Sequence, residues 1–309
     1  MFYCFSPNSD PFFNLAMEEV LLKNTTDDFI FLYINSPSVV TGKHQVAYAE
    51  MNFRFLHENN IPVIRRISGG GTVYHDYGNI NYSFIINGAK ENLIDFKKYT
   101  SPVTGFLNKL HLEANLEGKS NLRMNGLKFS GNAAHLFKNR VLHHGTILFN
   151  SDLNKLSAAL KISTGLYEHN GVPSARTEIF NLSQVLKLNK EKFIAGFKEY
   201  LFYDFKDLKD FQIEESLIDL AESLAEKKYR TFEWNIGYSP AYSFTNKPDG
   251  IYMEVKHGII ANCRFDGITG KKVSDNFLNG VTHEFSAIRK KLQFVFDVVE
   301  LNSMVYKFF

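Results

Sequence analysis

Hydrophobic residues recur at helical spacing in several stretches of the chain. Asp10-Pro11 combines a capping residue with a proline suited to the first helical position. Apolar positions then repeat every three to four residues, which predicts an amphipathic helix over 11–23. Ser101-Pro102 repeats the start signal before a second stripe, and two more helices are expected over 193–201 and 217–224. We expect each apolar stripe to face the core.

Strand-like segments lie between these helices. The segments 29–34, 61–67, 80–86 and 141–149 are rich in β-branched and aromatic residues. Strands that alternate irregularly with helices favour a mixed sheet over a regular βαβ repeat. The predicted fold class is therefore α+β, or mixed α/β.

The C-terminal part of the chain has a pattern of its own. Residues 238–247 show little periodicity. Beyond them, two strand-like runs flank the turn His257-Gly258 and predict a β-hairpin, and helical patterns follow over 283–292 and from 298 to the end. We therefore place a boundary near residue 246. This gives a large domain over 1–245 and a small α/β domain over 246–309, which is small but able to fold.

Composition excludes several classes of protein. Apolar residues make up 44% and charged residues 22% of the 309 residues, as in ordinary globular proteins. The 35 basic residues nearly balance the 33 acidic ones and form no dense block, so no nucleic-acid partner is expected. No signal-peptide pattern or long apolar run occurs, which predicts a cytoplasmic protein without a membrane segment. Cys4 and Cys263 lie too far apart in sequence for a Cys-rich zinc site.

The most informative segment is a glycine-rich run over 65–79, which reads RRISGGGTVYHDYGN. Three consecutive glycines cost conformational entropy, and they make sense where the main chain approaches a ligand and offers N–H groups to anionic oxygens. Arg65 and Arg66 could add charge-assisted hydrogen bonds to a phosphate or carboxylate. For three glycines alone, a flexible hairpin loop with solvated arginines is the commoner explanation. The run matches neither a Walker A loop nor a GxGxxG fingerprint.

Two further segments carry candidate chemistry. Lys128 stands among small residues in the run KFSGNAA, where a point charge could reach a phosphate without crowding. The pair His143-His144 precedes Gly145-Thr146. Adjacent histidines on a strand point to opposite faces, so they cannot chelate one metal ion together. We expect one of them in the core or hydrogen-bonded, and the other facing a pocket.

Taken in this order, the segments resemble the lipoate–protein ligase A family, within the wider group of biotin ligases and octanoyltransferases. The family's arginine strand with SGGG and His-Asp-x-Gly-Asn matches 65–79, its Lys-x-Ser-Gly-x-Ala matches 128–133, and its His-His-Gly-Thr matches 143–146. Two flanking motifs, at 35–45 and 233–240, agree as well. The resemblance covers essentially the whole chain. It implies a large ligase-like catalytic domain followed by a small C-terminal α/β accessory domain.

The resemblance also implies roles for matching positions. Lys128 would be the catalytic residue, stabilising the negative charge that develops at the α-phosphate and the acyl-adenylate carbonyl. Arg66 and the glycine loop would cradle the carboxylate of lipoate and the nucleotide, while His144 would border an apolar lipoyl tunnel and His75 and Asn79 would line or brace the loop. The remaining implied binding positions are Ser68, Gly69, Gly70, Gly71, Thr72, Val73, Tyr74, Ser130, Gly131 and Ala133.

The implied reaction is ATP-dependent activation of lipoate to lipoyl-AMP, with Mg²⁺ neutralising the phosphates, followed by transfer to a lysine of a partner. The implied partners are the apo lipoyl domains of 2-oxoacid dehydrogenase acyltransferase subunits and the glycine cleavage H protein. The sequence identifies no metal ligands. Neither cysteine lies in a matched segment, which argues against the cysteine thioester of octanoyltransferases.

Two departures from the family pattern leave alternatives open. Asn121 stands where the ligases usually have aspartate in Asn-Asp-Ile/Leu, and Glu178 stands near the place of an arginine in the adenylate-binding loop. Both changes lie on the nucleotide side of the site. They raise a lipoyltransferase that uses preformed lipoyl-AMP as the first alternative. A non-catalytic lipoyl-binding or docking module is the second.

Overall fold

The large part of the molecule is built on one mixed sheet. A computed structural model describes residues 1–88, 94–160, 166–175, 177–265 and 274–309. Its main sheet has eight strands in the order β12-β1-β2-β6-β10-β9-β8-β7, with parallel pairing at β1 and antiparallel pairing from β2 to β7. The strands are β1 Phe2–Phe5, β2 Phe29–Tyr33, β6 Asn79–Asn87, β7 Asn115–Glu117, β8 Asn121–Met124, β9 Leu127–Phe137, β10 Arg140–Leu148 and β12 Lys209–Asp210. The predicted mixed sheet is confirmed.

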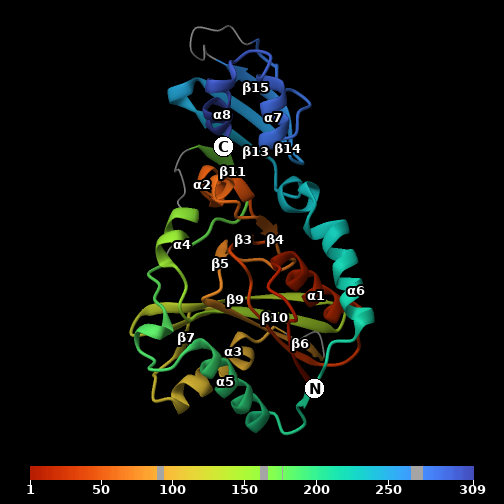
Figure 1. Ribbon diagram of the computed structural model, residues 1–309, viewed down its shortest axis with the longest axis vertical. Coiled ribbons are helices and arrows are strands. Elements are labelled where there is room, and N and C mark those ends of the chain that lie inside the picture. Colours follow the sequence, from red (N-terminus) through yellow and green to blue (C-terminus); the bar gives the residue numbers. More distant parts are fainter. Residues whose placement is uncertain (89–93, 161–165, 176, 266–273) are drawn as a thin grey trace.

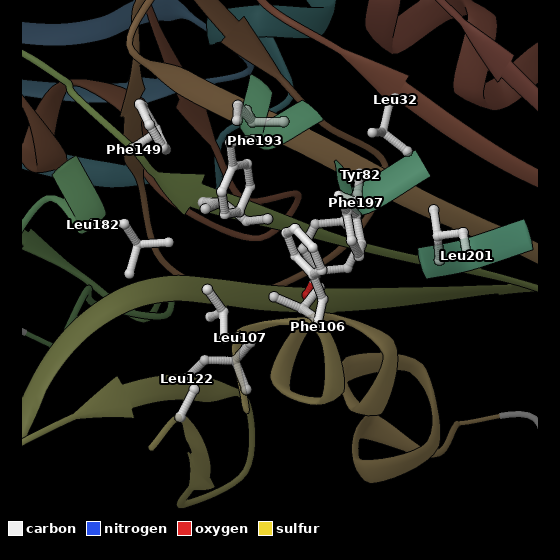
Figure 2. Packing of buried hydrophobic residues seen from close by; sticks show 14 of the residues in the cluster. Leu32, Tyr82, Phe106, Leu107, Leu122, Phe149, Leu182, Phe193, Phe197 and Leu201 are labelled. Atoms are coloured by element: carbon white, nitrogen blue, oxygen red, sulfur yellow. The ribbon is translucent and has the colours of Figure 1, made fainter. Parts of the chain in front are cut away.

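Helices cover both faces of this sheet (Figure 1). Helices α1 (Pro11–Asn24) and α6 (Glu215–Leu224) pack together over one face. On the other face, α3 (Phe96–Lys109) and α5 (Lys190–Asp204) enclose an aromatic core, in which Phe106, Phe193 and Phe197 lie against Tyr82 and Leu107 (Figure 2). The strand residues therefore point into two separate cores, which explains why the strand segments read as continuous apolar runs.

A second, three-stranded sheet stands beside the first and carries the glycine loop. It has the order β4-β3-β5, with β3 Ser38–Thr41, β4 Val63–Arg65 and β5 Val73–His75. The glycines lie in the connection between β4 and β5. Helices α2 (Phe53–Glu58) and α4 (Leu153–Ala159) pack at the far end of this sheet.

Two predicted helices differ from the structure. The stripe on α1 suggested an amphipathic helix, but α1 is buried on nearly every side, Glu18 and Glu19 included, because α6 and the sheet enclose it. Helix α3 begins after Asp95 rather than at Ser101-Pro102. Pro102 cannot donate to the carbonyl of Lys98, and the hydroxyl of Ser101 donates to that carbonyl instead (2.7 Å), so the helix continues through the proline.

The C-terminal residues form their own layer and core. A four-stranded sheet, β11-β13-β14-β15, is covered by α7 (Phe285–Leu292) and α8 (Val298–Val305). Its strands are β11 Tyr167–His169, β13 Tyr242–Asn246, β14 Ile251–Lys256 and β15 Ile259–Phe265. The expected hairpin is β14–β15, whereas β13 was not expected, and β11 joins this sheet from the middle of the chain. The boundary near residue 246 stays a prediction.

Candidate functional site

Two adjoining cavities open between the glycine loop and strands β9 and β10. Their volumes are about 280 Å³ and 450 Å³. Both are lined by Lys128, Gly131 and Thr146 on the large sheet and by Thr72 and Val73 at the end of the glycine loop, so they lie side by side and share a wall. Leu15, Tyr33 and Val40 wall the first cavity, and Leu148, Leu153, Leu156, Leu160 and Ile179 wall the second.

The glycine loop is held in a tight, defined conformation. Gly70 has φ +92°, which a side chain would strain. A Cβ atom at Gly42 would lie 2.0 Å from the carbonyl oxygen of Gly70, so the two backbone segments touch. Arg65 and Arg66 beside the loop are buried. The alternative of a flexible loop with solvated arginines is therefore wrong for this chain.

Arg66 holds this loop from inside. Its guanidinium donates hydrogen bonds to the carbonyl oxygens of Gly69 (2.6 Å) and Gly71 (2.8 Å), and also to Val40 and Ser68. Burial lowers the pKa of Arg66 to about 10, so its charge persists near neutral pH. Most of its N–H groups are engaged by the protein, and Arg66 acts on a ligand largely through the loop that it shapes.

Arg65 does not line either cavity, contrary to the expectation that it could bind a phosphate or carboxylate. Its guanidinium donates to the carbonyl oxygens of Gly42, Gln45 and Asn235, and its backbone N–H donates to the side chain of Asn235. Trp234 and Asn235, part of the motif at 233–240, therefore anchor β4 beneath the glycine loop.

Lys128 lies where the two cavities meet. A β-bulge at Phe129 in β9 leaves Phe129 in the core and turns Lys128 to the cavity face. A Cβ atom at Gly131 would lie 3.0 Å from Nζ of Lys128, so the glycine leaves room for the lysine. No residue in the described part of the chain accepts a hydrogen bond from this Nζ. Burial, followed by the nearby charges of Arg123 and Arg66, lowers the pKa of Lys128.

A buried polar chain closes the end of the first cavity. The carboxylate of Glu18 lies 2.9 Å from Nδ1 of His144, and Nε2 of His144 lies 2.6 Å from the hydroxyl of Ser68, which accepts from Nε of Arg66. Tyr33 and Ser83 also donate to Glu18. The chain fixes the orientation of the His144 ring and links helix α1 to the glycine loop. Motif matching missed Glu18 and Tyr33. The sequence signal that could have found Glu18 is a pair of glutamates at 18–19 within the apolar stretch 15–22.

The comparisons with known proteins agree with this geometry. The sequence model of the lipoyl protein ligase A/B catalytic domain matches residues 10–206. Lipoate-protein ligase LplJ of Bacillus subtilis is 34% identical over 301 residues, 92% of this chain and 91% of that one. Lipoate–protein ligase 1 of Staphylococcus aureus is 35% identical over 298 residues, 92% and 90%. The chain belongs to the lipoyl protein ligase A/B family.

Solved structures with ligands share the same fold. Protein Ta0514 of Thermoplasma acidophilum with bound lipoic acid has a TM-score of 0.66 and 25% identity, covering 76% of this chain and 98% of that one. A lipoate-protein ligase A bound with ATP has a TM-score of 0.64 and 25% identity, covering 76% and 96%. The resemblance to lipoate–protein ligases inferred from the motifs is thus confirmed.

The two histidines of the family's His-His-Gly-Thr motif point to opposite faces, as expected. His144 lines the first cavity. His143 lies in the core beside Phe96 and Tyr99, and burial lowers its pKa to about 3. Gly145 follows them because a Cβ atom there would lie 2.1 Å from Oδ1 of Asn132.

His75 of the family's His-Asp motif lines the first cavity and has a ring nitrogen that is unpaired among the described residues. The amide of Asn35 donates to its Nδ1 (2.9 Å), which places the ring proton on Nε2. Within the described ranges, this Nε2 is buried and has no hydrogen-bond partner. Burial lowers the pKa of His75 to about 3, so the ring stays neutral near neutral pH.

The structure brings most of the implied binding positions to one space. Twelve of them line a cavity: Arg66, Gly70, Gly71, Thr72, Val73, Tyr74, His75, Lys128, Ser130, Gly131, Ala133 and His144. Ser68 contacts His144 and Arg66 instead, and buried Asn79 braces Asn81, which lines the first cavity. The cavity expected to be an apolar tunnel is only partly apolar, because Asn81, Asn132 and His144 line the first cavity beside its apolar residues.

Proposed function

We propose that this protein is an ATP-dependent lipoate–protein ligase, which makes lipoyl-AMP and transfers the lipoyl group to a lysine of an apo lipoyl domain. One observation carries the proposal. Lys128 holds a partly buried ammonium group at the junction of two cavities, beside a glycine loop that Arg66 shapes. Relatives that match three quarters of the chain bind lipoic acid in one structure and ATP in another.

The two cavities suit the two halves of the adenylate. The acyl chain would lie in the first cavity against Leu15, Tyr33 and Val40, with its carboxylate near Lys128. The larger second cavity, with Leu153 and Leu156, would take the adenosine. Each buried methylene contributes ~0.8 kcal/mol, so a fitted wall selects a hydrocarbon chain of suitable length.

The chemistry proceeds in two steps. An oxygen of the lipoate carboxylate attacks the α-phosphorus of ATP, forming the mixed anhydride while pyrophosphate leaves. The acceptor lysine, as a neutral amine, then attacks the acyl carbon, forming the amide and releasing AMP. Lys128 stabilises the charge that develops at the α-phosphate and at the acyl oxygen. Neither step needs an enzyme nucleophile.

The cysteines support this direct route. Cys4 and Cys263 are both buried and line neither cavity. Burial raises the pKa of Cys4 to about 12, which disfavours the thiolate that a thioester mechanism requires. A cysteine-based octanoyltransferase reaction does not fit this site.

We further propose Mg²⁺ as the ion that accompanies ATP. Magnesium usually binds one or two carboxylates together with substrate phosphates. Glu50 and Glu178 line the second cavity and are the carboxylates there that could hold the ion. Among the described residues, no group of three potential metal ligands occurs, so the phosphates would supply most of the coordination.

The acceptor remains a proposal as well. One structural relative, from Thermoplasma acidophilum, is described as a bi-partite lipoate protein ligase and its E2 lipoyl domain. By analogy, we propose as partners the lipoyl domains of 2-oxoacid dehydrogenase acyltransferase subunits and the glycine cleavage H protein. A cytoplasmic location is likewise an expectation. In the described part of the chain no helix is long and apolar enough to cross a membrane.

Lipoate-dependent exchange of pyrophosphate into ATP tests the activation step. A ligase catalyses this exchange without any acceptor protein. A lipoyltransferase, the alternative raised by Asn121 and by the exposed Glu178 beside the second cavity, would modify an acceptor only from preformed lipoyl-AMP. A docking module would catalyse neither the exchange nor the transfer. The ammonium group of Lys128, which has no hydrogen-bond acceptor in the described structure, would then have no function in the cavity.

A further inference from the structure

Arg123 is a third basic side chain in the cavity and belongs to none of the motifs discussed above. It lies on β8 and lines the first cavity together with Arg66 and Lys128. Nη2 of Arg123 donates to the hydroxyl of Thr177 (2.6 Å), and Nη1 donates to the carbonyl oxygen of Gly126 (2.5 Å). Its side chain therefore spans from β8 to the segment after residue 176, which also borders the second cavity.

Strand pairing places Arg123 and Lys128 side by side. The two residues are direct partners in the antiparallel β8–β9 pair, and the bulge at Phe129 sets this register. Direct partners project from the same face of a sheet, and like charges in this arrangement destabilise each other. The neighbouring charge of Arg123 contributes to the lowered pKa of Lys128. An anion between the two side chains would relieve this repulsion.

The counter-charge that the protein provides for this pair is small. Glu117 lies 3.5 Å from Nε of Arg123, and its side chain is 52% exposed, so the ion pair is weak. Three of the five N–H groups of Arg123 face Glu117, Gly126 and Thr177, which leaves two for a ligand.

The triphosphate of ATP carries more negative charge than Lys128 and one Mg²⁺ ion together neutralise. Arg66 is largely engaged by the carbonyl oxygens of the glycine loop. Of the basic side chains that line the described cavity walls, Arg123 is the one that remains available beside Lys128. A guanidinium also matches two phosphate oxygens at once, which an ammonium cannot do.

We propose that Arg123 binds the β- and γ-phosphates of ATP, and then the pyrophosphate leaving group, beside Lys128. This inference rests on the proposed adenylation of lipoate. It also accounts for the departures at Asn121 and Glu178. Asn121 replaces an aspartate of the family pattern, and Glu178 stands near the place of an arginine. Arg123 supplies a positive charge on the phosphate side of the site, where that arginine is missing.

The variants Arg123→Met and Arg123→Lys test the proposal in the full-length protein. The loss of a charge-assisted hydrogen bond should raise the KM for ATP in pyrophosphate exchange about 10- to 100-fold in Arg123→Met. The rate of transfer from synthetic lipoyl-AMP to an apo lipoyl domain should stay close to wild type, because that substrate lacks the outer phosphates. Arg123→Lys should recover part of the ATP affinity because it keeps the charge.

Two control variants separate phosphate binding from a structural role. Glu117→Gln removes the exposed ion pair of Arg123 with the protein, keeps the charge of Arg123 and lies outside both cavities, so it should leave the KM for ATP nearly unchanged. Arg54→Met removes an exposed arginine that pairs with Glu58 on α2, and should change nothing. Equal KM values for Arg123→Met and Arg54→Met would overturn the proposal. Equal losses of exchange and transfer in Arg123→Met, reproduced by Glu117→Gln, would also overturn it, because they would show that Arg123 only holds the local structure.

Inhibition of the transfer reaction by pyrophosphate tests the contact between Arg123 and phosphate without requiring activation of lipoate. Pyrophosphate should inhibit transfer from lipoyl-AMP by the wild-type protein, and Arg123→Met should weaken this inhibition by a factor similar to the change in KM. If the wild-type protein fails to exchange pyrophosphate, the proposed ligase function fails. Weakened inhibition in Arg123→Met still supports the phosphate contact in that case, and unchanged inhibition overturns it.

Discussion

Replacing Lys128 by alanine should abolish activation and leave the fold intact. Loss of one preorganised charge contact in a transition state costs ~3–4 kcal/mol, a factor of ~10²–10³ in rate. Removing one partner of a buried ion pair would cost ~3–5 kcal/mol of stability. Lys128 has no such partner in the described structure, and its charged neighbours are Arg123 and Arg66. The free energy of unfolding should therefore stay within ~0.5 kcal/mol of wild type or rise.

Lipoate-dependent pyrophosphate exchange and urea unfolding of the same protein measure the two quantities. Lys155→Ala on α4 is the matched control, since that lysine is exposed and forms a long contact of 3.9 Å with Asp152. It should keep wild-type exchange and stability. A folded Lys128→Ala variant that exchanges within about tenfold of wild type would refute the role assigned to Lys128. A large loss of stability in Lys128→Ala would contradict the finding that Lys128 has no buried ion-pair partner in the described structure.

Three further predictions concern the glycine loop, the polar chain at the end of the first cavity and the buried His143. Gly70→Val should reduce exchange at least ~10²-fold, because its Cβ would lie 3.0 Å from Nη2 of Arg66 at φ +92°; a fully active variant would contradict the tight loop. Glu18→Gln should raise the KM for lipoate about tenfold and leave that for ATP unchanged, as steady-state kinetics would show, because it weakens the hold on His144. The free energy of unfolding should fall as the pH drops from 6.5 towards about 3. Burial keeps His143 neutral in the fold by lowering its pKa to about 3, whereas the unfolded chain takes up a proton near 6.5. This residue contributes at most ~1.4 kcal/mol per pH unit, and His143→Phe should flatten the urea-unfolding profile over that range.

The sequence predicted the elements whose signals are local. Capping at Asp10-Pro11 placed the start of α1 correctly, and the apolar runs placed β2, β6 and β10 within one or two residues. The predicted start of α3 was wrong because the hydroxyl of Ser101 donates to the carbonyl oxygen that Pro102 leaves without a backbone donor. Rules for helix capping do not include this hydrogen bond. Strand β11 pairs with β13, about 75 residues further along the chain, and such long-range pairing leaves no local pattern.

For the site, motif matching found the residues of the loop and strand but not the partners that orient them. Arg66 was expected to contact a substrate, and its hydrogen bonds to the glycine loop became visible only in the folded structure. Glu18 comes from α1 and meets His144 across 126 positions of sequence. Arg123 faces the cavity because a bulge in β9 shifts the register by one residue. Each of these relations depends on tertiary geometry, which residue spacing does not encode.

The mass of the acceptor lysine after incubation with the protein tests the central claim most directly. An apo lipoyl domain would be mixed with the full-length protein and either ATP, Mg²⁺ and lipoate or synthetic lipoyl-AMP alone. A ligase produces the same lipoylated lysine from both mixtures, and Lys128→Ala should lose modification in the ATP mixture. Modification by lipoyl-AMP with none from ATP and lipoate would contradict the account and identify a lipoyltransferase.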